Sequence, residues 1–220
     1  MATRQVLNEL AKAYGQRSGT DVAIEAVGGV DAAKRVAAGE PFDMVFLSRD
    51  AIEKLIASGQ VVAGSCVDLV DSGVSIAVKA GAPRPDVSSE DALKRAVLAA
   101  PTVGYSTGPS GVALVKLFER WGIAQELKGR LVQAPPGIPV GALVARGEVA
   151  LGFQQLSELI HLEGITVLGP MPAAVQITTT FSGALCKASS QGEAVGKLLA
   201  FMASPEADAA KRRNGMEPAA

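Results

Sequence analysis

The spacing of apolar residues divides the first part of the chain into alternating helices and strands. Apolar residues recur every three or four positions over residues 4–16, which predicts an amphipathic helix. Residues 21–27 alternate polar and apolar positions before a glycine pair, which predicts a strand. The same reasoning predicts a helix over 31–38, a strand over 43–47 and a helix over 49–57. This alternation favours an α/β fold with mainly parallel strands.

The middle of the chain begins with two apolar runs that have no helix between them. Residues 67–70 and 74–79 predict strands, and the Gly- and Pro-rich segment 81–85 predicts a stiff connector into a second lobe. A second series of strands and helices then runs to about residue 170. Its predicted helices cover residues 90–99, 112–121, 125–129 and 140–146, and its predicted strands cover residues 102–104, 130–133 and 149–153.

The last part of the chain predicts a return to the first lobe. Residues 175–185 are rich in Thr, Ile and Phe and predict a strand long enough to cross back. Helices over 192–202 and 205–214 follow. We therefore expect lobe 1 to contain residues 1–80 and 181–220, and lobe 2 to contain residues 81–180.

Composition excludes several functional classes. The 220 residues are 48% apolar and 20% charged, which is ordinary for a globular protein, and the net charge of −1 provides no field that would attract nucleic acid or an anionic membrane. Aromatic residues make up 4%, too few for base-stacking platforms. No apolar run approaches the length of a membrane span, and the N-terminus has no apolar signal-peptide core. We expect neither a nucleic-acid partner nor membrane insertion.

The potential metal ligands are few and scattered. Cys66 and Cys186 are far apart in sequence, and His161 is the only histidine. Their spacing matches no metal site, and two buried thiols are favoured over a disulfide. We expect no metal and no cofactor.

Small, hydroxyl-bearing or amide-bearing residues lie where predicted strands end and predicted helices begin. In open α/β sheets, ligands bind at such edges. The turn from Tyr105 to Gly111 leads into a helix whose first N–H groups and dipole favour an anion. A simpler interpretation is that Ser110 caps the helix and the glycines form the turn. The candidate ligand-binding residues at all such edges are Thr3, Arg4, Gly28, Gly29, Val30, Ser48, Ser106, Thr107, Ser110, Gly111, Gln154 and Gln155.

These edges lack the residues of several common active sites. None combines paired carboxylates or a Ser-His-Asp set, and the glycines match neither a dinucleotide fingerprint nor a phosphate loop. Recognition of an anion by N–H groups, hydroxyls and amides is the chemistry that they favour. For proton transfer the sequence offers Tyr105, Glu158, His161 or a nearby carboxylate without selecting one, so the catalytic residues stay unassigned.

Four segments resemble the molybdate-binding-protein-like branch of the type 2 periplasmic binding proteins. They are residues 74–85, 105–111, 139–159 and 204–207, and the part from Ala145-Arg146-Gly147-Glu148 to Gln154-Gln155-Leu156-Ser157-Glu158 is the most specific. The resemblance implies two α/β lobes with Rossmann-like sheets, joined by two crossing strands, and a ligand in the cleft. It also implies a strand before the first helix, so we expect the first strand of lobe 1 to be missing from this sequence.

The resemblance implies a substrate-binding protein of a transport system. Such a protein captures a small anion, either a molybdate-like oxyanion or a di- or tricarboxylate, and delivers it to the membrane component of an ABC transporter. The location implied is the periplasm, or the cytoplasm if Met1 is the true start. The same branch also resembles isomerases of small unsaturated carboxylates, similar to aconitate isomerase. From the sequence the binding protein is favoured, and the isomerase is the alternative.

Overall fold

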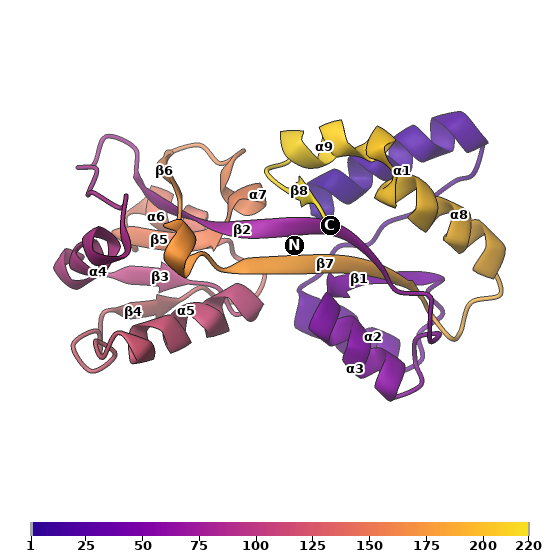
Figure 1. Cartoon of the computed structure of the whole chain (residues 1–220), viewed down its shortest axis with the longest axis horizontal. Helices are drawn as coiled ribbons and strands as arrows, with labels where there is room; N and C mark the ends of the chain where they lie inside the picture. Colours follow the sequence, from indigo (N-terminus) through magenta and orange to yellow (C-terminus); the bar gives the residue numbers. More distant parts are fainter. Residues whose placement is uncertain (1, 220) are drawn as a thin grey trace. The chain divides into compact units, whose positions relative to one another are not determined.

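A computed structural model describes residues 2–219, which form two compact units (Figure 1). Unit 1 contains Met1–Ser72 and Thr179–Ala220, and unit 2 contains Gly73–Thr178. The chain leaves unit 1 inside β2 (Val67–Lys79) and returns to it at the start of β7 (Thr178–Leu185).

Unit 1 is a sheet covered by helices on both faces. β1 (Met44–Ser48) pairs antiparallel with β7, and the short β8 (Glu217–Pro218) pairs antiparallel with β2. Alternate residues of β1 point to opposite faces: Val45 and Leu47 join one apolar cluster, and Met44 and Phe46 pack against another. The helices on one face are α1 (Arg4–Ser18), α8 (Gly192–Ala203) and α9 (Asp208–Arg213), and those on the other are α2 (Gly29–Ala37) and α3 (Arg49–Ala57) (Figure 1).

Unit 2 contains the parallel strands that the sequence predicted. β3 (Val103–Tyr105) lies between β4 (Leu131–Gln133) and β5 (Leu151–Gln155), parallel to both. β2 runs antiparallel to β5 on one side and to β6 (Ile165–Pro170) on the other. The covering helices are α4 (Glu90–Ala99) and α5 (Pro109–Arg120) on one face, and α6 (Val140–Arg146) on the other.

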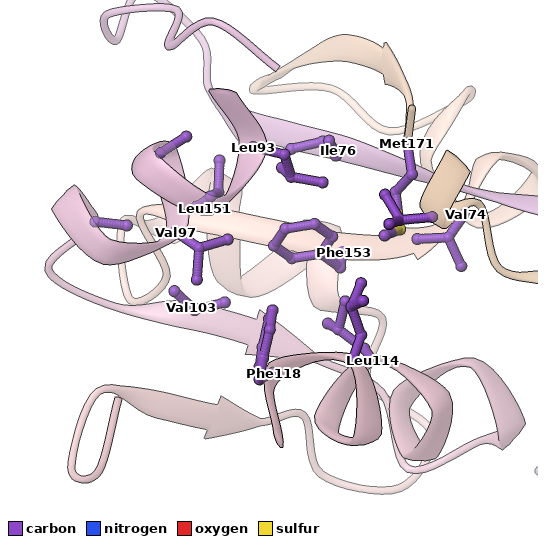
Figure 2. Packing of buried hydrophobic residues seen from close by; sticks show 14 of the residues in the cluster. Val74, Ile76, Leu93, Val97, Val103, Leu114, Phe118, Leu151, Phe153 and Met171 are labelled. Atoms are coloured by element: carbon purple, nitrogen blue, oxygen red, sulfur yellow. The ribbon is translucent and has the colours of Figure 1, made fainter. Parts of the chain in front are cut away.

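The core of unit 2 fixes the end of β5. Phe153 lies in the middle of this core, with Leu93 and Val97 of α4 and Phe118 of α5 around it (Figure 2). The rings of Phe118 and Phe153 meet edge to face, with centroids 6.2 Å apart. Since Gln154 directly follows Phe153, this packing holds the strand end in place.

Close packing also fixes α6 against the sheet. A Cβ atom on Gly152 of β5 would lie 2.5 Å from Val144 Cγ2, and one on Gly141 would lie 2.5 Å from Leu162 Cδ1. Because any side chain at either glycine would separate these elements, the absence of a Cβ allows α6 to start directly beside the end of β5.

Several predicted elements differ from the structure. Residues 21–27 keep alternating exposure, but within the described chain they make no backbone–backbone hydrogen bond and form no strand. Residues 125–129 form turns rather than a helix, since Lys128 N and Arg130 N bond to carbonyls three residues back. The pairs in unit 1 are antiparallel, which corrects the expectation of mainly parallel strands.

The sequence analysis also missed or mispredicted several short elements. The last predicted helix is a 3₁₀ turn, Pro205–Ala207, followed by α9. A second 3₁₀ turn, Ala173–Val175, precedes β7, and the single turn α7 (Leu156–Leu159) follows β5. Neither β6 nor β8 was predicted.

Three global features bear on function. Within residues 2–219, no helix is both long and apolar enough to cross a membrane. Both cysteines are free thiols, Cys66 half-buried and Cys186 buried. The described residues contain no group of three or more His, Cys, Asp or Glu side chains placed to hold a metal ion.

Candidate functional site

In unit 2, two candidate segments lie at one edge of the sheet. β3 and β5 are parallel neighbours, paired at Val103–Leu151 and Gly104–Gly152. Their carboxyl ends therefore share an edge, from which residues 106–108 lead into α5 and Gln155 leads into α7.

The turn after β3 folds back on the first turn of α5. The hydroxyl oxygens of Ser106 and Ser110 lie 3.3 Å apart, within hydrogen-bond distance. The Ser106 carbonyl oxygen occupies the space that a Cβ atom on Gly111 would need. Gly111 is therefore required for this approach, which places both hydroxyls at the start of the helix.

The start of α5 carries no side-chain cap. Gly108 is its N-cap residue, and Ser110 is the second helical residue, so the interpretation of Ser110 as the cap is wrong. The neighbouring helices differ: Ser89 Oγ accepts a hydrogen bond from Ala92 N at 3.2 Å in α4, and Gln154 Oε1 accepts one from Gly141 N at 3.3 Å in α6. Pro109 has no N–H and Gly111 N donates to Gly108 O at 3.0 Å, so Ser110 N is the N–H of this first turn that keeps its capacity to bind an anion.

Gln154 connects three elements of unit 2. Its side chain is buried, bonds α6 through Gly141 N and also hydrogen-bonds Glu158 in α7. Gln155 is equally buried. The structure therefore gives Gln154 an internal bridging function, while ligand contact by either glutamine stays a prediction.

The three candidates for proton transfer differ in their environments. Glu158 is half-buried, and burial raises the pKa of its carboxyl group. Tyr105 is half-buried at the end of β3, and His161 is exposed. The sequence could not rank these residues because it contains no direct signal of burial.

Unit 1 also brings candidate residues together. Gly28 is the N-cap of α2, and a Cβ atom on Gly29 would lie 3.7 Å from Leu47 Cδ2, so α2 starts beside the end of β1. Ser48 ends β1 and occupies the N-cap position of α3, where a serine commonly caps the helix, but its side chain makes no cap hydrogen bond.

The first helix shows the same pattern. Thr3 occupies the N-cap position of α1, but its side chain makes no cap hydrogen bond either. Thr3 instead lines an apolar cavity with Phe46 and Phe181. Arg4 and Val30 are exposed, as is Thr107 in unit 2.

Each unit thus gathers its own candidates at strand ends. Ser106, Ser110 and Gly111 are in contact in unit 2, and Gly29 lies beside the end of β1 in unit 1. The predicted cleft between the lobes stays a prediction. Sequence reasoning missed Gly141, whose N–H orients Gln154; the only available signal was its position in the first turn of a predicted helix.

Comparison with known proteins gives two functional associations. The family model described as "Bacterial extracellular solute-binding protein" matches residues 1–217. An aconitate isomerase from Pseudomonas sp is 41% identical over 220 residues, covering 96% of this chain and 83% of the relative.

Solved structures share the fold at low sequence identity. The periplasmic molybdate-binding protein of Azotobacter vinelandii has a TM-score of 0.79 at 20% identity, covering 98% of this chain and 95% of that protein. A periplasmic thiamin-binding protein has a TM-score of 0.77 at 17% identity, covering 98% of this chain and 79% of that protein. These are type 2 periplasmic binding proteins with two lobes. The family match over nearly the whole chain shows that this protein belongs to the bacterial extracellular solute-binding proteins.

Proposed function

We propose that this protein binds a small unsaturated polycarboxylate and isomerises it, with aconitate as the substrate. The observation that carries the proposal is the 41% identity with aconitate isomerase over most of both chains. The molybdate-binding and thiamin-binding structures, at 20% identity or less, support the fold alone. This identity supports the isomerase, which was the alternative from the sequence, more strongly than the low-identity structures support the binding protein.

The chemistry of aconitate suits an edge rich in neutral hydrogen-bond donors. Aconitate carries three carboxylates and a carbon–carbon double bond next to a CH₂ group. Removing a proton from that CH₂ group spreads negative charge through the double bond onto a carboxylate. The uncapped start of α5, with the hydroxyls of Ser106 and Ser110, offers donors that would stabilise this charge.

The second candidate is a binding protein that releases its ligand unchanged. The family description and the molybdate-binding structure favour it. In this function the protein would lie in the periplasm, capture a molybdate-like oxyanion or a carboxylate, and deliver it to the membrane component of an ABC transporter. The same helix-start donors would hold the anion.

One pair of measurements separates the two candidates. Purified protein is incubated with cis-aconitate, and formation of the trans isomer is followed by proton NMR against a protein-free control. Calorimetric titrations with molybdate, sulfate and tricarballylate, the saturated analogue of aconitate, measure binding without turnover. We expect trans-aconitate to form and tricarballylate to bind. Binding without any isomerisation would favour the transport function, and tight binding of molybdate alone would contradict the carboxylate assignment.

A further inference from the structure

We propose that Glu158 is the group that takes the proton from the substrate and returns it, an inference that rests on the proposed isomerase function. The geometry of unit 2 supports it in three steps: the position of Glu158 at the sheet edge, the neutral partner that orients it, and an unpartnered hydroxyl beside it.

The position of Glu158 follows from the end of β5. Glu158 lies in the single turn α7, three residues after the last residue of β5. Because β5 is the parallel neighbour of β3, this turn shares the sheet edge with the uncapped start of α5. A carboxyl group and a set of N–H and hydroxyl donors thus lie at one edge, as proton abstraction next to a carboxylate requires.

The partner of Glu158 is neutral and rigidly held. The Gln154 side chain hydrogen-bonds Glu158, and Gln154 Oε1 accepts a hydrogen bond from Gly141 N at 3.3 Å. Within residues 2–219, no ion pair involves Glu158. Because the amide is neutral, this hydrogen bond opposes protonation of the carboxylate less than an arginine in the same place would.

Other carboxyl groups of the described chain illustrate this difference. Hydrogen bonds from Arg213, Arg35, Ser88 and Lys197 lower the pKa values of Glu9, Glu25, Asp86 and Glu193 respectively. Burial raises the pKa of Glu158 instead. A carboxyl group with a raised pKa is a stronger base, and its pKa lies closer to neutral pH, so it is better suited both to take a proton and to carry it to the next carbon.

The residue before Glu158 supports a ligand at this turn. Ser157 Oγ is buried and has no hydrogen-bond partner among the described residues. A buried hydroxyl without a partner is uncommon in native structures. A carboxylate oxygen of the substrate would satisfy it and would place the reacting CH₂ group near Glu158.

The proposed step conserves every atom. The Glu158 carboxylate takes a proton from the CH₂ carbon, the C–H electron pair forms the new double bond, and the old double bond becomes a carbanion conjugated with a carboxylate. Protonated Glu158 then gives the proton to the former vinyl carbon. The double bond has moved by one position, no redox partner is needed, and the released product has the cis or trans geometry of the new bond.

The test compares Glu158→Gln with Glu163→Gln. The second variant is the matched control, because Glu163 is exposed and lies shortly after Glu158 in the sequence. Turnover of cis-aconitate is measured by NMR, exchange of the CH₂ protons is measured in D₂O, and tricarballylate binding is measured by calorimetry. We expect Glu158→Gln to lose about 10²- to 10⁴-fold in turnover and to lose exchange. Tricarballylate should bind it as well or more tightly, since a negative charge is removed. Glu163→Gln should match the parent.

Each other result contradicts the assignment in a distinguishable way. Turnover by Glu158→Gln at the rate of an active parent would overturn the inference and leave the isomerase function standing. Loss of tricarballylate binding together with turnover would assign Glu158 to ligand binding or folding and overturn its function in proton transfer. A parent that binds tricarballylate but forms no trans-aconitate would overturn both the isomerase function and the inference.

Discussion

At the scale of single residues, the structure separates serines that cap helices from serines whose hydroxyls stay available. Both Ser48 and Ser89 stand directly before a helix, so their residue type predicts a cap at either position. Ser89 has an extended backbone, φ −136° and ψ 165°, and accepts from Ala92 N, whereas Ser48 has φ −57° and ψ 144° and makes no cap bond. This difference lies in backbone dihedrals, which the sequence alone does not specify.

The first residue-scale prediction concerns the two hydroxyls at the start of α5. Ser106→Ala and Ser110→Ala each remove one donor at the proposed ligand edge, so each should weaken tricarballylate binding by about 0.5 to 1.5 kcal/mol, the net value of one hydrogen bond. Calorimetric titration measures this change, and thermal unfolding should show a fold close to that of the parent.

Ser89→Ala is the matched control for this prediction. It removes a hydroxyl that caps α4 and should therefore lower the free energy of unfolding by about 0.5 to 2 kcal/mol without changing affinity. Parent-like binding by both Ser106→Ala and Ser110→Ala would show that the ligand does not use this turn.

At the scale of elements, local patterns predicted helices better than strand pairings. A helix satisfies its hydrogen bonds within itself, so the periodicity of residues 4–16 was sufficient to predict α1. Residues 21–27 have strand-like alternation, but a strand needs a neighbour, and within the described chain none bonds to their backbone. The sequence cannot supply that non-local information.

Strand β2 shows the opposite error, because the sequence predicted a break where the structure has a continuous strand. Its apolar pattern is interrupted at Asp71 and Gly73, which suggested two strands rather than one. In the structure Thr180 Oγ1 donates to Asp71 at 2.6 Å, and the Gln176 side chain lies over Gly73. Residues distant in sequence therefore contact Asp71 and Gly73, and the strand continues through both positions.

At the candidate site, residue types predicted which strand ends and helix starts carry the candidates. The hydrogen bond from Gly141 to Gln154 depends on α6, and the sequence could not place α6 beside β5.

The element-scale prediction tests the contact between the turn after β3 and α5. Gly111→Ala would place a methyl group where the Ser106 carbonyl lies, so the turn must move, and we expect a loss of about 1 to 3 kcal/mol in the free energy of unfolding and weaker tricarballylate binding. Gly196→Ala is the control, because Gly196 lies in the exposed part of α8 with no atom near its Cβ position. This change should stabilise the protein by about 0.5 to 1 kcal/mol. Equal stability of the two variants in chemical denaturation would contradict the tight contact.

At the scale of the whole molecule, the fold does not determine which ligand is bound. Structures of similar fold are described as binding molybdate in one case and thiamin in another, and a relative of higher identity is an isomerase. The chemistry must therefore come from residues at the strand ends rather than from the architecture that carries them. The same architecture does permit a prediction about stability, because within the described chain unit 1 contains an unpaired segment whose Val22 and Ile24 pack against its apolar core.

Unit 1 should unfold before unit 2 on heating. In unit 1, residues 21–27 have no backbone–backbone hydrogen bond within the described chain, and an apolar cavity lies beneath α1 between Leu7 and Phe46. Trp121, the single tryptophan, belongs to unit 2, where its indole N–H donates to Glu90 at 2.6 Å. Its fluorescence therefore follows unit 2, whereas far-UV circular dichroism follows both units, so the dichroism midpoint should lie at the lower temperature.

Leu93→Ala is the control, because it creates a cavity in unit 2 and should lower the free energy of unfolding by about 2 to 5 kcal/mol. It should lower the fluorescence midpoint and so narrow or reverse the difference between the two midpoints. Coincident curves in the parent would instead show that the strands shared by the two units make them unfold together.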